Sequence, residues 1–351
     1  MIGATRGLSL SVLTYNLHLF GDTALYRHGG VLQETGFYYK DHERLPQIIA
    51  GLRRTEADVI GLTEVWDEGM RGEIEGSLKD LYPYHVASPA AAGIGRVIND
   101  FQDKWPLLAQ ILFGAGGGVV NHFTKGHYSV GKTGLLTGLM NYLSEEQVPR
   151  AIARWLRSGP VWGAGLLFLS RYPIVASDFH PHDERADWEV LAGKGVLEAT
   201  VRPDTGPEMT FSLGHYQEGI SPRAMQTRGR QIHRARNRTR KVPASLFHIG
   251  DFNVAGATRE YAAMSRTMSL RDVNAGDTYL EPNPYQDKLQ APRSQDARTQ
   301  RIDYIFHSGD LVMESARILR GEFRSRDAEH DLSDHFPLLA RFFHRPEVTA
   351  I

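Results

Sequence analysis

The sequence contains no cysteine among its 351 residues. Without cysteine the chain can form no disulfide, no thiol nucleophile and no thiolate metal site. Any metal ion must therefore be held by side chains of Asp, Glu, Asn and His. These ligands favour hard divalent cations such as Mg²⁺.

The chain also has almost no net charge, at -1 with the histidines neutral. This balance excludes a whole-molecule attraction to nucleic acid or to an anionic membrane, so any electrostatic recognition must come from local patches. The composition, with 41% hydrophobic and 23% charged residues, is ordinary for a globular protein. It argues against a disordered chain and against a coiled coil.

The sequence also gives no sign of a targeting or membrane-spanning segment. Residues 1–11 have neither a long apolar core nor a small-residue cleavage site, so we expect no secretory signal. We accordingly expect a cytoplasmic protein, or an exported one if a signal has been removed. The apolar stretch 107–120 is shorter than the about 20 residues that cross a bilayer.

Residues 89–162 interrupt an otherwise regular series of predicted strands and helices. Gly-Ala-Gly-Gly-Gly breaks the segment at 114–118, and Val148, Ile152 and Trp155 follow at helical spacing. We predict a single domain over residues 1–351 with a helical, partly apolar insertion at 89–162. The insertion either packs on the main domain, which is the simpler interpretation, or makes a peripheral membrane contact.

An informative turn follows the apolar run 244–249, which predicts a buried strand. Gly250 comes next and indicates a place where the backbone closely approaches another segment. Asp251 and Asn253 then offer an acceptor and a donor that can converge on a reacting phosphate. Taken alone, this pair is more simply interpreted as an ordinary turn whose side chains bond their own backbone.

Similar polar side chains lie at or near the ends of the other predicted strands: Asn16, Glu64, His215, Asp303, Asp334 and His335. Each of them alone has a plain structural interpretation, as a capping asparagine, a salt-bridged carboxylate or a structural histidine. Together with Asp251 and Asn253 they favour metal-assisted attack of water on phosphorus.

Two further polar segments are interpreted as solvated surface. Residues 221–241 are strongly basic on a predicted helix, and the alternative to a solvated helix face is a surface for an anionic partner. The loop with His180, His182, Asp183 and Glu184 lacks the ligand spacing of a known metal site, although metal binding is an alternative there.

The motifs as a set resemble the endonuclease/exonuclease/phosphatase superfamily. They are Thr-Tyr-Asn at 14–16, Glu-Val-Trp at 64–66, Gly-Asp-Phe-Asn at 250–253, Arg-Ile-Asp-Tyr at 301–304 and Ser-Asp-His-Phe-Pro at 333–337. The resemblance covers nearly the whole chain and implies an α/β fold, a four-layered α/β sandwich of two packed mixed sheets flanked by helices. Periodicity alone predicts only a mixed α/β protein.

The resemblance also implies a role for each site residue. Glu64 is expected to bind Mg²⁺, or Mn²⁺ or another divalent cation, while Asn16 and Asp334 help to hold the metal or its waters. Asp251 and Asn253 are expected to contact the scissile phosphate and the attacking water.

The histidines have their own implied roles. His215 is expected to stabilise the phosphoryl oxygens, and His335 to act as general base or phosphate contact. Asp303 then accepts the other ring proton of His335 and fixes its tautomer. The sequence leaves the choice of general base between Asp251 and His335 open.

Within the superfamily the chain looks most like the neutral sphingomyelinases, through the motifs at 64–66, 165–174, 193–197 and 283–285. This narrower resemblance implies a phosphodiesterase of phospholipase C type that cleaves a phospholipid headgroup. The alternatives are a nuclease acting on DNA or RNA and an inositol phosphate phosphatase. A non-catalytic binding protein ranks last, because no motif position is degenerate.

Overall fold

A computed structural model describes residues 9–21, 25–28, 31–34, 40–89, 163–186, 189, 192–240, 245–281, 298–326 and 331–344. The helical insertion predicted at 89–162, with its membrane contact, lies outside the described residues except for residue 89. In the described part of the chain, no helix combines the length and the apolar character that crossing a membrane requires.

Two six-stranded mixed sheets form the centre of the molecule. The first sheet has, in spatial order, β15 (Leu311–Ile318), β16 (Leu338–His344), β1 (Ser9–Leu19), β4 (Val59–Val65), β6 (Leu167–Ser170) and β5 (Tyr84–Ala87). Its one parallel pair is β1 with β4, and the other neighbours are antiparallel.

The second sheet repeats this plan with one parallel pair, β10 with β9. Its order is β11 (Arg271–Asp272), β14 (Asp303–His307), β10 (Ser245–Asp251), β9 (Met209–His215), β8 (Gly195–Val201) and β7 (Ile174–Pro181). Two small ribbons complete the strands, β2 (Leu25–His28) with β3 (Val31–Glu34) and β12 (Tyr279–Glu281) with β13 (Arg298–Gln300).

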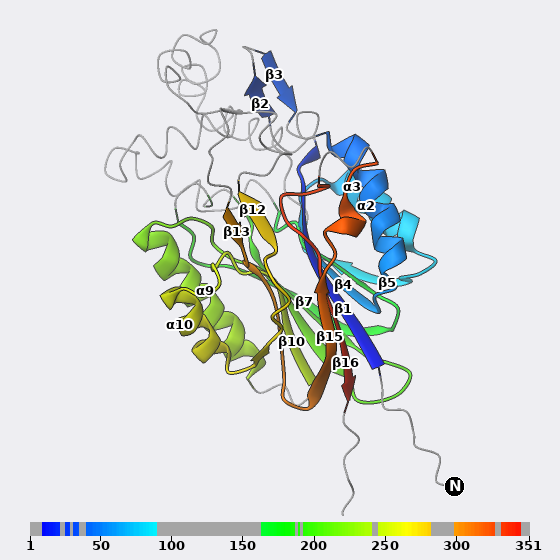
Figure 1. The fold of residues 1–351 in the computed structure, drawn as a ribbon, viewed down its shortest axis with the longest axis vertical. Coiled ribbons are helices and arrows are strands. Elements are labelled where there is room, and N and C mark those ends of the chain that lie inside the picture. The colour runs from blue at the N-terminus through cyan, green and yellow to red at the C-terminus, as the bar shows by residue number, and fades with distance from the viewer. Residues whose placement is uncertain are drawn as a thin grey trace, which may run out of the picture.

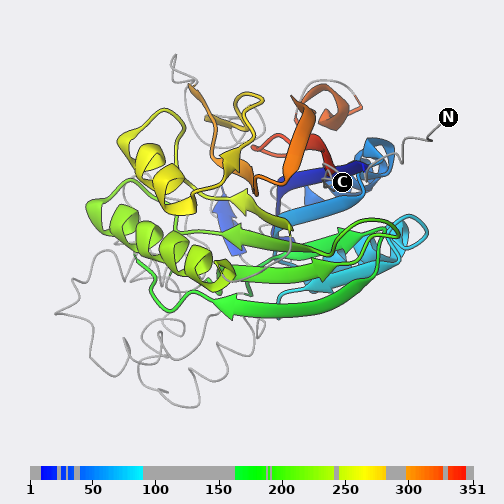
Figure 2. The same cartoon turned by 90° about the horizontal axis from the view of Figure 1, so that it is seen from below.

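Helices cover the outer face of each sheet, as Figures 1 and 2 show. The first sheet carries α2 (Asp41–Thr55), α3 (Glu68–Leu78) and the short η4 (Gly321–Phe323), and the second carries α9 (Pro222–Thr239) and α10 (Arg259–Met268). Separate apolar clusters fill the three interfaces, with Phe211, Phe247 and Phe342 between the two sheets. The predicted four-layered sandwich is confirmed.

Residues 165–174 contain a buried strand, β6 (Leu167–Ser170), and a turn that ends at Pro173 and leads into the opposite sheet. β6 ends at Ser170, and β7 begins at Ile174 in the second sheet. The Ser170 hydroxyl accepts from the Tyr172 N–H at 3.0 Å and donates to the Tyr172 carbonyl at 2.8 Å. This local turn, followed by Pro173, carries the chain from one sheet to the other.

At Gly250 the backbone closely approaches a neighbouring strand, as the sequence predicts. It pairs with Gly214 across β10 and β9 and has a φ of +123°. A Cβ atom at this position would lie 2.1 Å from the Gly214 carbonyl oxygen, which is backbone and cannot move aside cheaply. Only glycine therefore fits at the residue that precedes Asp251.

A Gly250→Ala protein is expected to lose at least about 2 kcal/mol of unfolding free energy, because both the φ angle and the contact with Gly214 become strained. Urea unfolding followed by circular dichroism measures the loss. Gly72→Ala is the control, since Gly72 lies in α3 and a Cβ there meets nothing within 4 Å. Equal stability of the two variants would contradict the prediction.

His248 makes the stability of the fold depend on pH. It is buried in β10, and its Nε2 lies 2.8 Å from the Thr239 hydroxyl. Burial, helped by the charges of Arg236 and Arg238, lowers the pKa of His248 to about 3. The unfolded chain has a pKa of about 6.5 at this position, so below that pH protons bind mainly to the unfolded state.

The stability that neutral His248 contributes is therefore fully present above about pH 6.5 and is lost as the pH falls toward 3. Between pH 7 and 5 the unfolding free energy of a His248→Gln protein is expected to fall less than that of wild type, by roughly 2 kcal/mol. Urea unfolding at the two pH values measures both slopes. Identical slopes would show that His248 binds a proton in the folded protein.

Candidate active site

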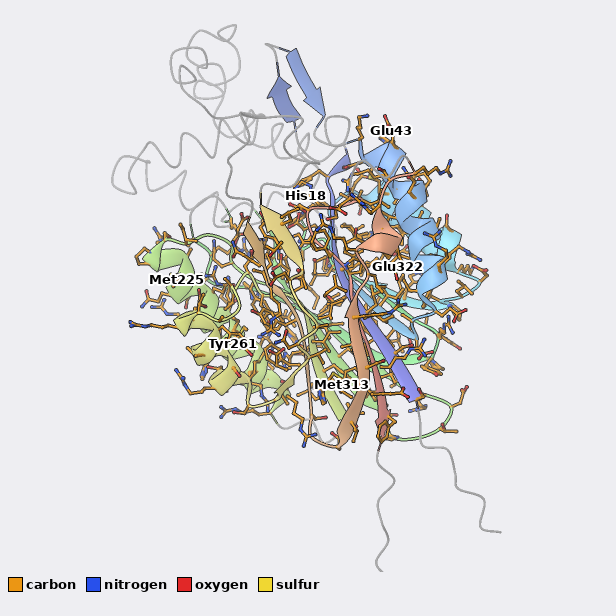
Figure 3. All side chains as sticks on the ribbon, in the orientation of Figure 1. His18, Glu43, Met225, Tyr261, Met313 and Glu322 are labelled. Carbon is orange, nitrogen blue, oxygen red and sulfur yellow. The ribbon has the colours of Figure 1, made fainter. Side chains whose placement is uncertain are left out.

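The strand ends that carry the predicted site residues meet at one end of the sandwich. In the second sheet, Asp251 at the end of β10 lies opposite His215 of β9 and Asp303 of β14. Figure 3 shows His18, from β1, near this end and Met313 at the other end of the molecule. The sheet register therefore places three of the predicted site residues side by side.

Asn16 joins the two sheets at the site. Its amide Nδ2 donates to Glu64 Oε1 at 2.9 Å and to Asp251 Oδ2 at 3.1 Å. Its Oδ1 accepts from the His18 N–H at 3.1 Å. In this arrangement Asn16 orients two carboxylates, one from each sheet, and its predicted part in holding the metal stays a prediction.

A first group of possible metal ligands consists of Glu64, His215 and Asp251. One ligand atom from each lies within 4.8 Å of the other two. Both ring nitrogens of His215 are buried and have no hydrogen-bond partner in the described part of the chain. Two carboxylates and an unpartnered imidazole fit a divalent cation.

The protonation state of His215 agrees with a role as a metal ligand. Burial, followed by the charges of Lys194 and His335, holds the pKa of His215 well below its usual range. The ring is therefore neutral at physiological pH, which is the form that binds a metal ion or accepts a hydrogen bond.

A second group consists of Asp251, Asp303 and His335. His335 Nδ1 donates to Asp303 Oδ2 at 2.8 Å, and His335 Nε2 lies 3.9 Å from Asp251 Oδ2. Burial alone would lower the pKa of His335, but the charge and hydrogen bond of Asp303, with Asp334 and Asp251, raise the pKa to about 10. Burial and then the charge of Asp303 raise the pKa of Asp251 to about 7.

Asp334 lies near these two groups and precedes β16 of the first sheet. Its Oδ2 lies 3.9 Å from His18 Nε2, and Ser333 Oγ donates to its Oδ1 at 3.2 Å. Burial acts to raise the pKa of Asp334, but the charges of His18, His335 and Arg44 outweigh burial and lower it. Asp334 is therefore an ionised carboxylate next to the first group.

Three residues at the site have backbone angles that are rare outside glycine. The φ angles are +50° at His18, +56° at Glu64 and +53° at Asn253. Such angles cost of order 1–3 kcal/mol each and persist where the surrounding structure holds them. At Asn253 the turn is held by its own N–H, which donates to Asp251 Oδ1 at 2.8 Å, and by its Nδ2, which donates to the Tyr216 carbonyl at 3.0 Å.

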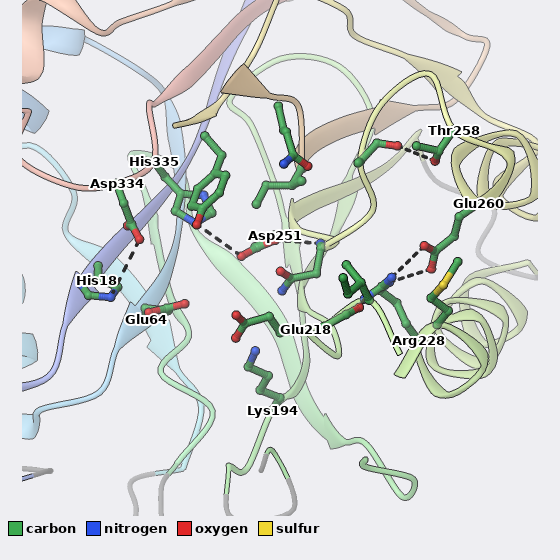
Figure 4. A pocket seen from close by; sticks show the side chains of 18 of the residues that line it. His18, Glu64, Lys194, Glu218, Arg228, Asp251, Thr258, Glu260, Asp334 and His335 are labelled. Carbon is green, nitrogen blue, oxygen red and sulfur yellow. Dashed lines mark hydrogen bonds and ion pairs between the residues drawn. The ribbon is translucent and has the colours of Figure 1, made fainter. Parts of the chain in front are cut away.

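A cavity of about 790 Å³ is lined by six residues of this site, whereas Asn16, His215 and Asp303 do not line it. The six are His18, Glu64, Asp251, Asn253, Asp334 and His335. Figure 4 shows Asp334 and His335 on one side of the cavity and the ion pair of Arg228 with Glu260 on the other. Lys194 also lines it, bonded to the buried Glu189 and to the Tyr216 carbonyl.

Sequence reasoning did not select His18 or Lys194 as site residues. The Gly-Lys-Gly motif was a signal for Lys194, whereas nothing in the sequence around His18 marks it.

The polar loop after β7 was predicted to be solvated surface, but the structure buries one of its histidines. His182 is buried, and its Nε2 donates to the His215 carbonyl at 3.1 Å. Burial lowers the pKa of His182 to about 3, so it acts as a neutral structural support for His215. A local sequence pattern gives no sign of this contact, because the partner lies on another strand.

The sequence pattern of the Endonuclease/Exonuclease/phosphatase family matches residues 13–335. The chain belongs to this family. Members of the endonuclease/exonuclease/phosphatase family are metal-dependent phosphoric ester hydrolases, and this protein is an enzyme of that class. The resemblance that the motifs indicate is confirmed. No curated protein matches the chain.

Solved structures of the endonuclease/exonuclease/phosphatase fold match nearly the whole chain. Sphingomyelinase C from Streptomyces griseocarneus is 19% identical with a TM-score of 0.58, covering 95% of this chain and 99% of that one. A beta toxin mutant from Staphylococcus aureus, solved with bound magnesium ions, is 14% identical with a TM-score of 0.59 and coverages of 96% and 100%. TDP2 from Caenorhabditis elegans is 14% identical with a TM-score of 0.55, covering 96% and 75%.

At these identities the solved structures establish the shared fold and not a shared substrate.

Proposed function

We propose that the protein is a Mg²⁺-dependent phosphodiesterase of phospholipase C type that releases the phosphorylated headgroup from sphingomyelin or a related phospholipid. The endonuclease/exonuclease/phosphatase family supplies the reaction class, hydrolysis of a phosphoric ester. The choice of a lipid rests on the surface charge around the cavity and agrees with the motifs shared with neutral sphingomyelinases.

The observation that carries this choice is the pairing of the basic helix α9. Arg228 pairs with Glu260 at 2.7 Å, Arg230 with Glu184 at 2.7 Å, and Arg238 with Glu198 at 3.5 Å. Arg234 likewise pairs with Glu184 and Asp183. A helix that binds a nucleic acid backbone must direct its cations at phosphates, and here nearby carboxylates offset much of that charge.

The cavity itself also suits a small zwitterionic headgroup better than a polyanion. Glu218 and Glu260 line it beyond the first and second groups of site residues. At the rim lie Ile220 and Met225, with exposed fractions of 95% and 39%. Glu260 is paired with Arg228, so Glu218 is the acidic group that favours a headgroup cation, and the apolar rim favours contact with the adjoining lipid.

Glu64 and Asp251, with His215 and the nearby Asp334, are the side chains that we expect to hold the divalent ion. When bound, such an ion draws charge from the phosphate and lowers the pKa of water. The oxygen-rich ligand set favours Mg²⁺, and the magnesium-bound beta toxin structure supports the same choice.

The other side chains act on the substrate and on the proton. We expect Asn253 and His335 to contact the phosphate, and the bond from His335 Nδ1 to Asp303 supports a role for Asp303 in holding that ring. The attacking water loses its proton to Asp251, because His335, with a pKa of about 10, already carries both ring protons. A bond forms between the water oxygen and phosphorus, and the bond from phosphorus to the lipid oxygen breaks. The lipid oxygen takes up a proton from His335 and leaves as an alcohol, and the proton held by Asp251 then restores His335.

Release of phosphorylated headgroup from lipid vesicles tests the proposal. Purified protein with Mg²⁺ is expected to release phosphocholine from sphingomyelin vesicles, and EDTA is expected to stop the release. Plasmid DNA and an inositol phosphate, incubated in parallel, are expected to remain intact. No release from any phospholipid, together with Mg²⁺-dependent cutting of DNA over a range of salt concentrations, would overturn the proposal in favour of a nuclease.

A further inference from the structure

We propose that Asp41 and Arg44, on the first turn of α2, form a positioning pair that sets the spacing between two arms of the active site. The first arm is residues 16–21, which contain Asn16 and His18. The second arm is residues 332–335, which contain Asp334 and His335. The inference rests on the proposed metal site. It adds two residues that lie outside the sequence motifs typical of the family.

Asp41 fixes the end of the first arm. It is fully buried, and its Oδ2 accepts from the Phe20 N–H at 2.8 Å and from the Gly21 N–H at 2.9 Å. Its other oxygen accepts from Arg44. These bonds hold the chain where it leaves β1 after His18.

Arg44 joins the first arm to the second. Its Nη1 donates to the Leu17 carbonyl at 3.1 Å and to the Leu332 carbonyl at 2.5 Å. Its Nη2 donates to the His18 carbonyl at 2.6 Å. One planar guanidinium therefore bonds the residue after Asn16, His18 itself and the residue that precedes Ser333.

The two arms meet again at Ser333, whose hydroxyl donates to the Asn16 carbonyl at 2.8 Å. The two arms also carry His18 and Asp334, whose Nε2 and Oδ2 atoms lie 3.9 Å apart. A displacement of Leu332 relative to Leu17 would change both this separation and the distance from Asp334 to Glu64. The guanidinium of Arg44 bonds the carbonyls of both Leu17 and Leu332.

The bonds of the Asp41–Arg44 pair indicate a role in positioning the two arms and not only in stabilising α2. A buried ion pair loses hydration, and its net contribution to stability is often close to zero. Here Asp41 and Arg44 also bond five backbone groups of the two arms. Arg53, on the same helix, pairs instead with the exposed Asp80 and with the Ser77 carbonyl, away from the site.

Mg²⁺ binding by isothermal titration calorimetry, without substrate, tests the inference on Arg44→Met, Arg44→Lys and the control Arg53→Met. Arg44→Met is expected to weaken Mg²⁺ binding about 10- to 100-fold, as loss of a group that orients metal ligands commonly does. Its kcat is expected to fall while the KM for lipid stays near that of wild type. Arg53→Met is expected to match wild type in both.

Arg44→Lys separates geometry from charge. An ammonium group keeps the positive charge but lacks the planar fork that bonds Leu17, His18 and Leu332 together, so its Mg²⁺ binding is expected to be as weak as that of Arg44→Met. Recovery of wild-type binding in Arg44→Lys would overturn the proposal. So would wild-type binding in a folded Arg44→Met protein.

Folding is checked by near-ultraviolet circular dichroism, and Asp41→Asn serves as a second variant if Arg44→Met does not fold. A folded Asp41→Asn protein is expected to show the same weakened binding, and unchanged binding would overturn the proposal. Failure of every variant to fold would overturn it too, since the pair would then be needed for the fold. A wild-type protein that binds no Mg²⁺ would overturn the proposed function together with this inference.

Discussion

A Glu64→Gln protein is expected to hydrolyse phospholipid at least roughly 10²-fold more slowly than wild type and to bind Mg²⁺ more weakly. Glu64 is the carboxylate of the first sheet that faces His215 Nε2, at 3.6 Å, and its Oε1 already accepts from Asn16. Glutamine keeps the size of the side chain but removes the negative charge that a divalent ion requires. The loss should therefore appear in kcat/KM and in the calorimetric Kd for Mg²⁺ alike.

Glu68→Gln is the matched control for this experiment. Glu68 lies in the first turn of α3, and its side chain, 63% exposed, is 3.6 Å from Arg71. An exposed pair of this kind contributes little, so the control should match wild type in activity and in Mg²⁺ affinity. A Glu64→Gln protein that retained wild-type hydrolysis would remove Glu64 from the metal site.

An Asp303→Asn protein is expected to lose roughly 10²- to 10⁴-fold in kcat while it stays folded. Against the lowering effect of burial, Asp303 raises the pKa of His335 to about 10 and holds the proton on Nδ1. An amide at this position can neither balance an imidazolium nor require that tautomer. Both the orientation and the charge of the ring are then no longer fixed.

The pKa of His335, followed by NMR in metal-free protein, gives an independent measurement. Its value should fall in Asp303→Asn, since the main group that raises it is gone. In wild type the folded pKa lies above the unfolded value of about 6.5, so the pair contributes stability that is fully present below pH 6.5 and lost as the pH rises through about 10. An unchanged pKa and kcat in the variant would show that Asp303 has only a packing role.

The site residues were accessible from the sequence where a polar side chain follows a strongly apolar strand. Glu64 ends an apolar run in β4, and Asp251 ends one in β10, so each is visible as a carboxylate at a strand end. Arg44 and Asp41 leave no such mark. Their bonds reach backbone groups up to 288 residues away, as from Arg44 to Leu332, and a backbone group has no sequence signature.

The helices and strands also differ in how far the sequence predicts them. Features set by nearby residues are predictable, and features set by distant partners are not. Thr258 caps α10, and its hydroxyl accepts from the Tyr261 N–H at 3.1 Å. A sequence can indicate a cap of this kind, because capping depends only on nearby residues. Strand β15 was not predicted. It lies at the edge of the first sheet, four of its eight residues are exposed, and it is a strand because β16 pairs with it.

The amide of Asn16, which bonds Glu64 from one sheet and Asp251 from the other, has a consequence for divided forms of the protein. A chain cut between β5 and β6 would leave Asn16 and Glu64 on one fragment and His215, Asp251 and His335 on the other. Neither fragment would carry a complete set of catalytic groups. Hydrolysis would return only when the fragments associate, so the enzyme's own reaction would report their reassembly.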